Sequence, residues 1–294
     1  MRSSLSKLIV AFTLLALAAA CGGSTKVNES TNTTSSGGGK TSTSLFGFGN
    51  VTTTTPSFKE VPGLKVRFAN FYTDANGKGA PLDVYWGLSP QYGKKIMTLQ
   101  YGKVTDYMTG EKNPADSDQQ SLPISWTLEG KNGPQSALMN EQQDLGAGDQ
   151  VTFVTATGDM QTASNPSVSS QVINEKSTKD IAIDAPKPGK AAVYLNSLGV
   201  EHLGSGGGGF VTLGTTADPC MQTYVENGRG NGGAVYAFAP GTVKVQAYDA
   251  NACNGKPAVT DPLELNLSAG DQVIVFAYGA TKDARLLTSA KVAS

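Results

Sequence analysis

Short stretches in which apolar and polar residues alternate constrain the fold of this chain most. Residues 242–249 (TVKVQAYD), 263–267 (LELNL) and 124–129 (ISWTLE) each place apolar side chains at every second position. A period of two puts these side chains on one face of a β-strand. Turn sequences such as NGKG, EGKNGP and NACNGKP separate the stretches. Apart from residues 8–20, no 12-residue stretch carries a convincing helical stripe, and the sequence therefore predicts an all-β protein.

One phrase occurs twice. Residues 145–151 read LGAGDQV and residues 267–273 read LSAGDQV, while residues 62–70 (PGLKVRFAN) align with residues 188–196 (PGKAAVYLN). The two matches have nearly equal offsets and bracket about 85 residues in each half. Solenoid repeats have periods of about 20–50 residues, so the pattern indicates duplication of a whole domain. In each AGDQV we expect Gly and Asp to form a turn and Gln-Val to enter the next strand, which is a structural role.

These patterns predict two tandem antiparallel β-sandwich domains of the Ig-like or Greek-key kind, because each half holds several short strands separated by turns. We place the first sandwich at residues 58–176 and the second at residues 186–294.

Three motifs resemble those of a known family. They are APLDVYWG (residues 80–87), FAPGTVKVQAYD (residues 238–249) and the two L-x-AGDQV segments. In this order they resemble the bacterial family catalogued as domain-of-unknown-function 4397, although the second half lacks a clear DVY and the first half lacks PGT. The resemblance implies a β-sandwich that is often tandem and often carried by envelope lipoproteins. It supplies no catalytic residues.

Residues 1–20 have the features of a bacterial lipoprotein signal peptide. Two basic residues precede an apolar run at 8–20, which is shorter than the roughly 20 residues of a transmembrane helix. The following LAAAC resembles a lipobox, with Ala18 where leucine is preferred. We therefore expect lipidation at Cys21 by fatty acyl chains such as palmitate, which anchor a protein to a membrane. Gly22 replaces the Asp that retains lipoproteins at the inner membrane, which favours the outer membrane.

Residues 21–57 join this anchor to the sandwiches. After the cysteine they are mostly Ser, Thr, Gly and Asn (GGSTKVNESTNTTSSGGGKTSTS), a composition that buries little apolar surface. We expect a flexible linker with a root-mean-square reach of roughly 30–36 Å.

Composition and motifs argue against several classes of function. The net charge is −1 and 16% of the residues are charged, without a basic stripe, so nucleic acid is not an expected partner. His202 is the only histidine, beside a glycine-rich run (204–209) that lacks the strand and helix of a dinucleotide site. Residues 74–83 (DANGKGAPLD) do not follow the order of a calcium loop. We expect no metal and no cofactor.

Two cysteines remain after lipidation. Cys220 and Cys253 form an even pair in an exported protein, which predicts a disulfide. Closing a loop of about 34 residues would stabilise the fold by roughly 3–4 kcal/mol.

Aromatic residues are the candidate ligand contacts. Phe71-Tyr72 and Tyr85-Trp86 are neighbours that cannot both face one core if their strands are regular. One ring of each pair should face outward unless the strand bulges, and exposed rings would bind sugars or a protein partner. Tyr72, Tyr85 and Trp86 are the candidates. The alternative is that the outward rings pack under loops or against the other domain.

Taken together, these features predict a non-enzymatic, lipid-anchored envelope protein that binds a glycan or protein partner. One alternative is a structural spacer. The other is a glycan-acting hydrolase that uses carboxylates of the loop at 106–118. That loop carries the following acidic residues: Asp106, Glu111, Asp116 and Asp118.

Overall fold

The computed structural model describes residues 42–45, 48–52, 57–74, 76–112, 121–133, 136–157, 168–177, 182–198, 210–225, 232–248, 258–279 and 286–293. The chain divides into two compact units, Met1–Thr54 and Thr55–Ser294. The regular elements of the described residues are all strands, which confirms the all-β prediction. This described part contains no helix that could span a lipid bilayer. Residues 1–20 and Cys21 lie outside it.

The first unit contains one pair of strands. β1 (Ser42–Leu45) and β2 (Phe48–Thr52) pair antiparallel, with Ser42 opposite Thr52 and Leu45 opposite Phe48. Thr, Val and Phe favour extended backbone, and they are frequent in this stretch. The segment predicted to be a flexible linker therefore contains a piece of regular structure.

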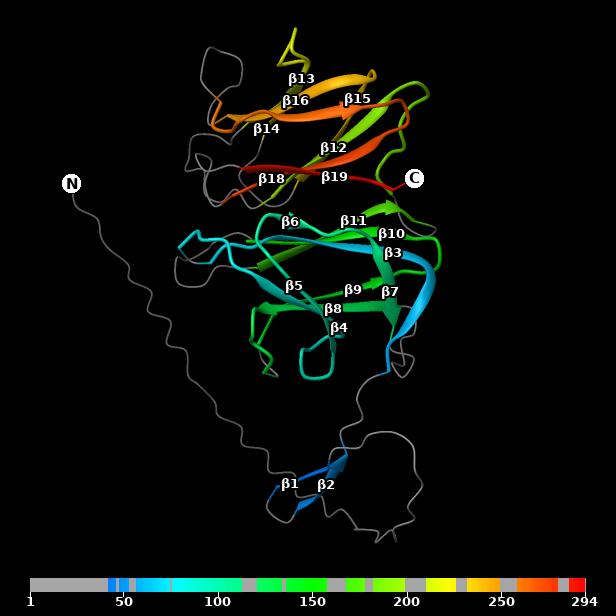
Figure 1. Cartoon of the computed structure of the whole chain (residues 1–294), viewed down its shortest axis with the longest axis vertical. Helices are drawn as coiled ribbons and strands as arrows, with labels where there is room; N and C mark the ends of the chain where they lie inside the picture. Colours follow the sequence, from blue (N-terminus) through cyan, green and yellow to red (C-terminus); the bar gives the residue numbers. More distant parts are fainter. Residues whose placement is uncertain are drawn as a thin grey trace, which may run out of the picture. The chain divides into compact units, whose positions relative to one another are not determined.

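The second unit begins with a β-sandwich. Its strands are β3 (Lys59–Phe71), β4 (Leu82–Trp86), β5 (Lys94–Leu99), β6 (Lys103–Val104), β7 (Met108–Lys112), β8 (Ser121–Leu128), β9 (Ala137–Asp144), β10 (Gln150–Thr157) and β11 (Val168–Lys176). One sheet has the order β11-β10-β3-β6, with β7 also paired to β3, and the other has the order β5-β4-β8-β9 (Figure 1).

A second sandwich follows. Its strands are β12 (Ala191–Ser197), β13 (Phe210–Gly214), β14 (Gln222–Val225), β15 (Gly232–Phe238), β16 (Gly241–Tyr248), β17 (Leu263–Leu267), β18 (Gln272–Tyr278) and β19 (Leu286–Lys291). Their orders are β15-β12-β18-β19 and β14-β13-β16-β17. Each sheet of this sandwich therefore has a counterpart in the first, with β3 matching β12, β10 matching β18 and β11 matching β19.

The sandwich architecture is confirmed, with one departure from a purely antiparallel pattern. In each sandwich the first strand pairs in parallel with the penultimate one, β3 with β10 and β12 with β18. A parallel pair needs a long connection between its strands. Here the chain passes through the other sheet of the same sandwich before it returns, so the requirement is met.

The repeated AGD forms the same turn in both copies. The Asp149 carboxylate accepts the Gly146 amide at 2.8 Å, and the Asp271 carboxylate accepts the Ser268 amide at 2.9 Å. The glycine before each aspartate has a positive φ, 90° at Gly148 and 86° at Gly270, which favours glycine at that position. The interpretation of the repeated phrase as a structural turn is confirmed.

The other matched pair, residues 62–70 and 188–196, is one residue out of register in space. Gly148 donates its amide to the Gly63 carbonyl, whereas Gly270 donates to the Lys190 carbonyl, so Gly63 corresponds to Lys190 and not to Gly189. A shift of one residue turns a side chain to the other face of a strand. Asn70 and Asn196 look equivalent in the sequence but are not equivalent in the fold.

Those two asparagines serve different neighbours. The Asn70 side-chain amide donates to the Ala80 and Leu99 carbonyls inside the first sandwich, at 2.8 and 2.9 Å. The Asn196 side-chain amide donates to Gln171 Oε1 of β11 at 3.0 Å. One asparagine therefore organises its own sandwich and the other joins the two sandwiches.

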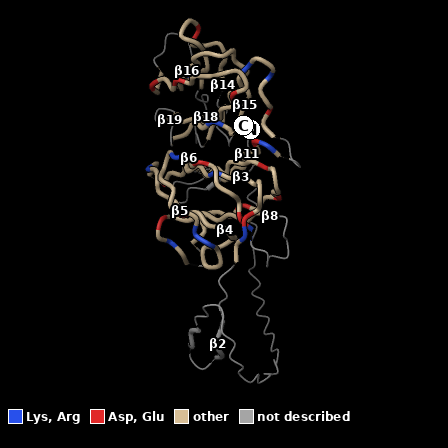
Figure 2. Tube along the Cα trace, turned by 45° about the vertical axis from the view of Figure 1, so that its right-hand side comes forward, with Lys and Arg blue, Asp and Glu red and all other residues tan. Residues whose placement is uncertain are grey.

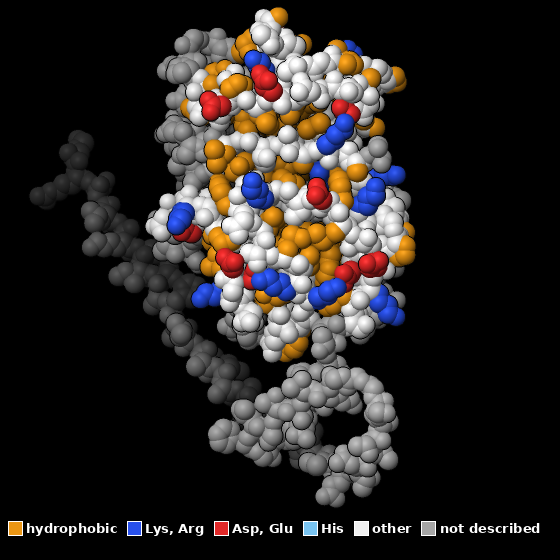
Figure 3. All heavy atoms as spheres, viewed as in Figure 1, with side chains coloured by type: hydrophobic (Ala, Val, Ile, Leu, Met, Phe, Trp, Pro, Cys, Tyr) orange, Lys and Arg blue, Asp and Glu red, His pale blue; other side chains and the backbone are white. Residues whose placement is uncertain are grey.

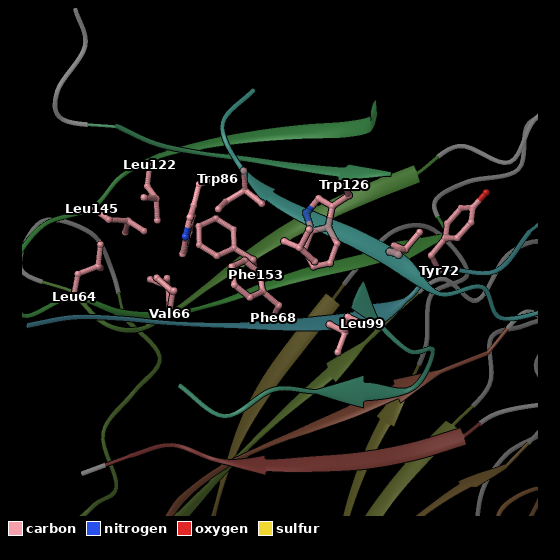
Figure 4. Close-up of a cluster of buried hydrophobic side chains, with 14 residues drawn as sticks. Leu64, Val66, Phe68, Tyr72, Trp86, Leu99, Leu122, Trp126, Leu145 and Phe153 are labelled. Carbon is pink, nitrogen blue, oxygen red and sulfur yellow. The ribbon is translucent and has the colours of Figure 1, made fainter. Parts of the chain in front are cut away.

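Aromatic rings dominate the core of the first sandwich. The Phe68 ring lies with its centroid 5.7 Å from Trp86, 5.7 Å from Trp126 and 5.8 Å from Phe153 (Figure 4). All four side chains are almost completely buried. Aliphatic residues such as Leu195, Val245 and Val275 fill the core of the second sandwich.

A third apolar core lies between the sandwiches. Ala69 and Phe71 from β3 and Val154 from β10 cluster with Ile274 and Phe276 from β18. Figure 1 shows these strands in the two sheets that face each other across the junction. Because the outer faces of these sheets are buried on each other, the two sandwiches form one packed body.

Candidate functional site

The predicted aromatic contact Tyr72 is buried, with 5% of its surface exposed. Its side chain belongs to the first core (Figure 4), while Phe71 enters the third core. There the Phe71 ring centroid lies 5.0 Å from that of Phe276 and 4.4 Å from that of Tyr278. The expectation of an exposed ring at this pair is wrong, because the second sandwich covers the outer face of β3. The alternative, packing against the other domain, holds.

Tyr85 and Trp86 are also buried, with 6% and 2% exposed. Trp86 faces the first core, and the pairing of β4 with β5 shifts register between Val84 and Tyr85. The loop after β4 packs closely on Tyr85, since a Cβ added to Gly93 would lie 3.3 Å from the Tyr85 Cβ. Tyr85 and Trp86 are therefore not an exposed binding surface either.

Of the four acidic residues of the predicted hydrolase loop, the structure describes Asp106 and Glu111. Glu111 forms an ion pair with Lys94, with 2.6 Å between Oε2 and Nζ, and Asp106 is exposed. Asp116 and Asp118 lie outside the described residues.

The aspartates of residues 74–83 have structural partners. Asp74 Oδ1 accepts the backbone amides of Lys78 and Asn76, both at 2.9 Å, and these hydrogen bonds, the one from Lys78 first, lower the Asp74 pKa. Asp83 pairs with Lys95 at 2.8 Å. Among the described residues, no three acidic, histidine or cysteine side chains gather as metal ligands.

Three predicted features fall outside the described residues: His202, the glycine run at 204–209, and Cys253. Cys220 is described, and its amide donates to Asp218 Oδ1 at 3.1 Å in the turn before β14. The bridge between Cys220 and Cys253 and the lipidation of Cys21 remain predictions.

Among the described residues, a network of buried polar side chains lies at the junction between the sandwiches. Arg67 of β3 and Glu175 of β11 form an ion pair with 2.7 Å between Nη2 and Oε1, and their side chains are 3% and 0% exposed. Arg67 Nε also donates to Thr152 Oγ1 at 2.7 Å on β10, the strand between them. Three adjacent strands of the first sandwich thus meet at one guanidinium group.

Tyr107 and Gln150 extend this network. The Tyr107 hydroxyl donates to Glu175 Oε2, and Gln150 Nε2 donates to both the Tyr107 hydroxyl and Glu175 Oε2, each at 2.9 Å. The Arg67 guanidinium lies 4.5 Å from the Tyr107 ring centroid, which is a cation–π distance. Burial, followed by the negative charge of Glu175, raises the Tyr107 pKa.

The network also binds the second sandwich. Arg67 Nη1 donates to the Lys291 carbonyl at 2.9 Å, and Gln150 Nε2 approaches the Ala293 carbonyl at 3.3 Å. Val292, between these two carbonyls, belongs to the third core. The segment after β19 is therefore held from the first sandwich by both polar and apolar contacts.

A cleft of about 480 Å³ adjoins this network, lined by Tyr107 from the first sandwich and by residues 270–272 and 291–293 from the second. We call it the junction cleft. On its wall Lys291 pairs with Asp271, with 2.7 Å between Nζ and Oδ1. This hydrogen bond, and the one from the Ser268 amide, lower the Asp271 pKa. Gln272 Nε2 donates to the Asp184 carbonyl at 3.1 Å, in the connection between the sandwiches.

Sequence reasoning did not single out Arg67, Tyr107, Glu175 and Lys291, because they are scattered over more than 200 positions and no common motif connects them. One signal did point to the junction. The glutamine of each AGDQV, Gln150 and Gln272, points out of its own sandwich toward the junction or the connection. Besides the turn, the repeated phrase therefore supplies a glutamine that reaches the second sandwich at Ala293 in the first copy and the connection at Asp184 in the second copy.

Charges are mixed over the second unit. Acidic and basic residues are interspersed over both sandwiches (Figure 2), and apolar side chains lie among them on the surface (Figure 3). Among the described residues, the most exposed large apolar side chain is that of Tyr92, at 64%, in the loop between β4 and β5.

Comparisons with known proteins give little further information. No family model and no curated protein matches the chain. A crystal structure of a protein from Bacteroides ovatus, provisionally assigned to cell adhesion, is 11% identical, with 79% of this chain and 97% of that chain covered and a TM-score of 0.24. Human GIVD cytosolic phospholipase A2 is 12% identical, with 80% and 32% covered and a TM-score of 0.19. At such TM-scores neither similarity bears on function.

Proposed function

We propose that this chain is a non-enzymatic lipoprotein of the bacterial cell envelope that binds a glycan or protein partner. A lipid on Cys21 would hold it to the membrane, most consistent with the outer membrane, and residues 22–57 would carry the sandwiches away from the surface. Resemblance to domain-of-unknown-function 4397 fits this role.

The junction cleft carries the binding part of the proposal. Its walls come from both sandwiches, and the buried Arg67–Glu175 network holds both. A buried ion pair adds little net stability, because removing two charges from water offsets their attraction. The network therefore contributes little to stability, but it holds the walls of the cleft in place. A binding site that must keep its shape for a ligand requires such support.

The described acidic residues of the hydrolase loop do not favour the enzymatic alternative. A glycosidase needs two carboxyl groups about 5–10 Å apart across a sugar. The Glu111 carboxylate is paired with the Lys94 ammonium group, and Asp106 lies exposed.

Anchoring is tested by fractionating cells that express the full chain. We expect Cys21→Ser to move the protein from the membrane to the soluble fraction. Cys220→Ser is the matched control and should remain with the membrane. If Cys21→Ser also stays with the membrane, the lipid anchor is rejected.

Binding and catalysis are separated by incubating the purified full chain with isolated envelope polysaccharide. We expect the chain to be retained on the polysaccharide, or on envelope proteins offered in a separate pull-down, without release of reducing ends. Release of reducing ends that Glu111→Gln abolishes would establish the hydrolase and overturn the non-enzymatic proposal.

A further inference from the structure

We propose that the junction cleft is a saccharide site in which the Tyr107 ring packs against a sugar, an inference that rests on the proposed binding function. Unlike the buried candidates Tyr72, Tyr85 and Trp86, Tyr107 lines a cleft. The cleft volume of about 480 Å³ lies within the roughly 300–1,000 Å³ of small-ligand sites.

Tyr107 offers a ligand its ring and not its hydroxyl. The hydroxyl already donates to Glu175 and accepts from Gln150. Arg67 lies over the ring on the side of the buried network. Because Tyr107 also lines the cleft, we assign the ring surface that Arg67 leaves uncovered to the C–H groups of a pyranose ring.

The opposite wall supplies polar partners without net charge. Asp271 is an acceptor, and Lys291, whose side chain is 65% exposed, is a donor. Sugar hydroxyl groups both donate and accept, so such a pair can serve them. Nearby Val292 adds an apolar surface to the wall.

Other ligand classes fit less well. A nucleotide or another phosphate ester needs an excess of positive charge, and on this wall the Lys291 charge is balanced by Asp271. A purely apolar ligand would bury the Asp271–Lys291 pair at a cost in desolvation. A neutral saccharide combines an apolar face with hydroxyl groups, as the two walls require.

The site is preorganised by contacts that the ligand does not make. Arg67 binds Tyr107 through the ring and through Glu175, and it binds the Lys291 carbonyl through Nη1. One guanidinium group thus fixes the aromatic wall and the polar wall relative to each other. Little of the binding free energy is then spent on ordering the cleft.

The test uses the purified full chain on an array of neutral and acidic oligosaccharides that includes β-1,4-linked N-acetylglucosamine and α-1,4-linked glucose trimers. Affinities of the bound saccharides are then measured by calorimetry. We expect Tyr107→Leu to weaken binding about tenfold. Tyr107→Phe, which keeps the ring, should bind more tightly than Tyr107→Leu.

Two further variants keep the test decisive. Tyr92→Leu, at an exposed tyrosine of the same sandwich, should bind as the wild type does. Lys291→Met changes the polar wall and leaves the Lys291 backbone carbonyl for Arg67, so it should fold normally and bind several-fold more weakly. Thermal unfolding of each variant shows whether a loss of binding reflects a loss of fold.

The outcomes separate this inference from the broader function. Saccharide binding that survives both Tyr107→Leu and Lys291→Met overturns the cleft assignment and leaves the binding function standing. A wild-type chain that binds no saccharide but cross-links to an envelope protein overturns the ligand class alone. If neither a saccharide nor an envelope protein is bound, both proposals fall.

Discussion

Arg67 and Glu175 are 108 positions apart in the sequence and form an ion pair of 2.7 Å that is almost completely shielded from solvent. The same guanidinium reaches the Lys291 carbonyl of the second sandwich. A buried side chain of the first sandwich is therefore hydrogen-bonded to the second sandwich, so the junction is a specific interface between the two domains.

Removal of Arg67 should be strongly destabilising. Arg67→Met leaves the Glu175 carboxylate buried without its positive partner, which costs about 3–5 kcal/mol of unfolding free energy. The double variant Arg67→Met/Glu175→Gln should recover part of this loss. Urea denaturation measures both. The more exposed Lys94–Glu111 ion pair provides a control, since Lys94→Met should lower the unfolding free energy by less than about 1 kcal/mol. Equal losses for Arg67→Met and Lys94→Met would contradict the buried role.

The third core should make the sandwiches unfold together. We expect one cooperative thermal transition for the wild type. Phe71→Ala removes a ring that packs on Phe276 and Tyr278, and truncating a buried phenylalanine costs about 3–5 kcal/mol. Calorimetry of this variant should show two separated transitions. Two transitions already present in the wild type would show that the junction does not couple the sandwiches.

The repeated turn permits a matched pair of glycine substitutions. Gly148 has a φ of 90°, so Gly148→Ala should cost about 1–2 kcal/mol of unfolding free energy. Gly146→Ala should be nearly neutral, because an added Cβ meets nothing within 4 Å and the second copy carries Ser268 at that place. Chemical denaturation of the two variants is the measurement. A reversed order would refute the assigned turn.

Acid should destabilise the protein partly through Asp83. Burial raises its pKa, but hydrogen bonds from Lys95, Thr98 and the Gly130 amide outweigh this and lower it overall. Because the folded pKa lies below the unfolded value of about 3.9, the stabilising contribution is complete above roughly pH 5 and is lost as the pH falls through the folded pKa. Between pH 5 and pH 2 the unfolding free energy should therefore fall less steeply in Asp83→Asn than in the wild type. Identical slopes would exclude this contribution.

The predicted disulfide has its own test. Reduction should lower the unfolding midpoint, with a loss of roughly 3–4 kcal/mol in the chain-entropy model. Cys220→Ser and Cys253→Ser should each reproduce this loss and should no longer respond to the reducing agent. Sensitivity to reduction that persists in Cys253→Ser would rule out the bridge.

Local sequence patterns predicted the strands and turns but not which side chains of those strands are buried by other parts of the fold. Alternation in residues 242–249 and 263–267 predicted β16 and β17, and the repeated AGD predicted the turns at Asp149 and Asp271. The sequence left open whether Phe71 is exposed or packs against the other domain, because its burial depends on Phe276 and Tyr278, more than 200 residues later in the chain. A strand with two apolar faces and a strand with an exposed aromatic ring look the same in the sequence.

By itself, the sequence determined the all-β class, the duplicated plan and the turn chemistry, because these follow from the spacing of neighbouring residues and from backbone preferences. Only the tertiary structure decided that the two sandwiches share a third core and that Arg67, Tyr107, Glu175 and the end of β19 meet around one cleft. Such contacts depend on how whole sheets pack face to face, and no local pattern records which surfaces will meet.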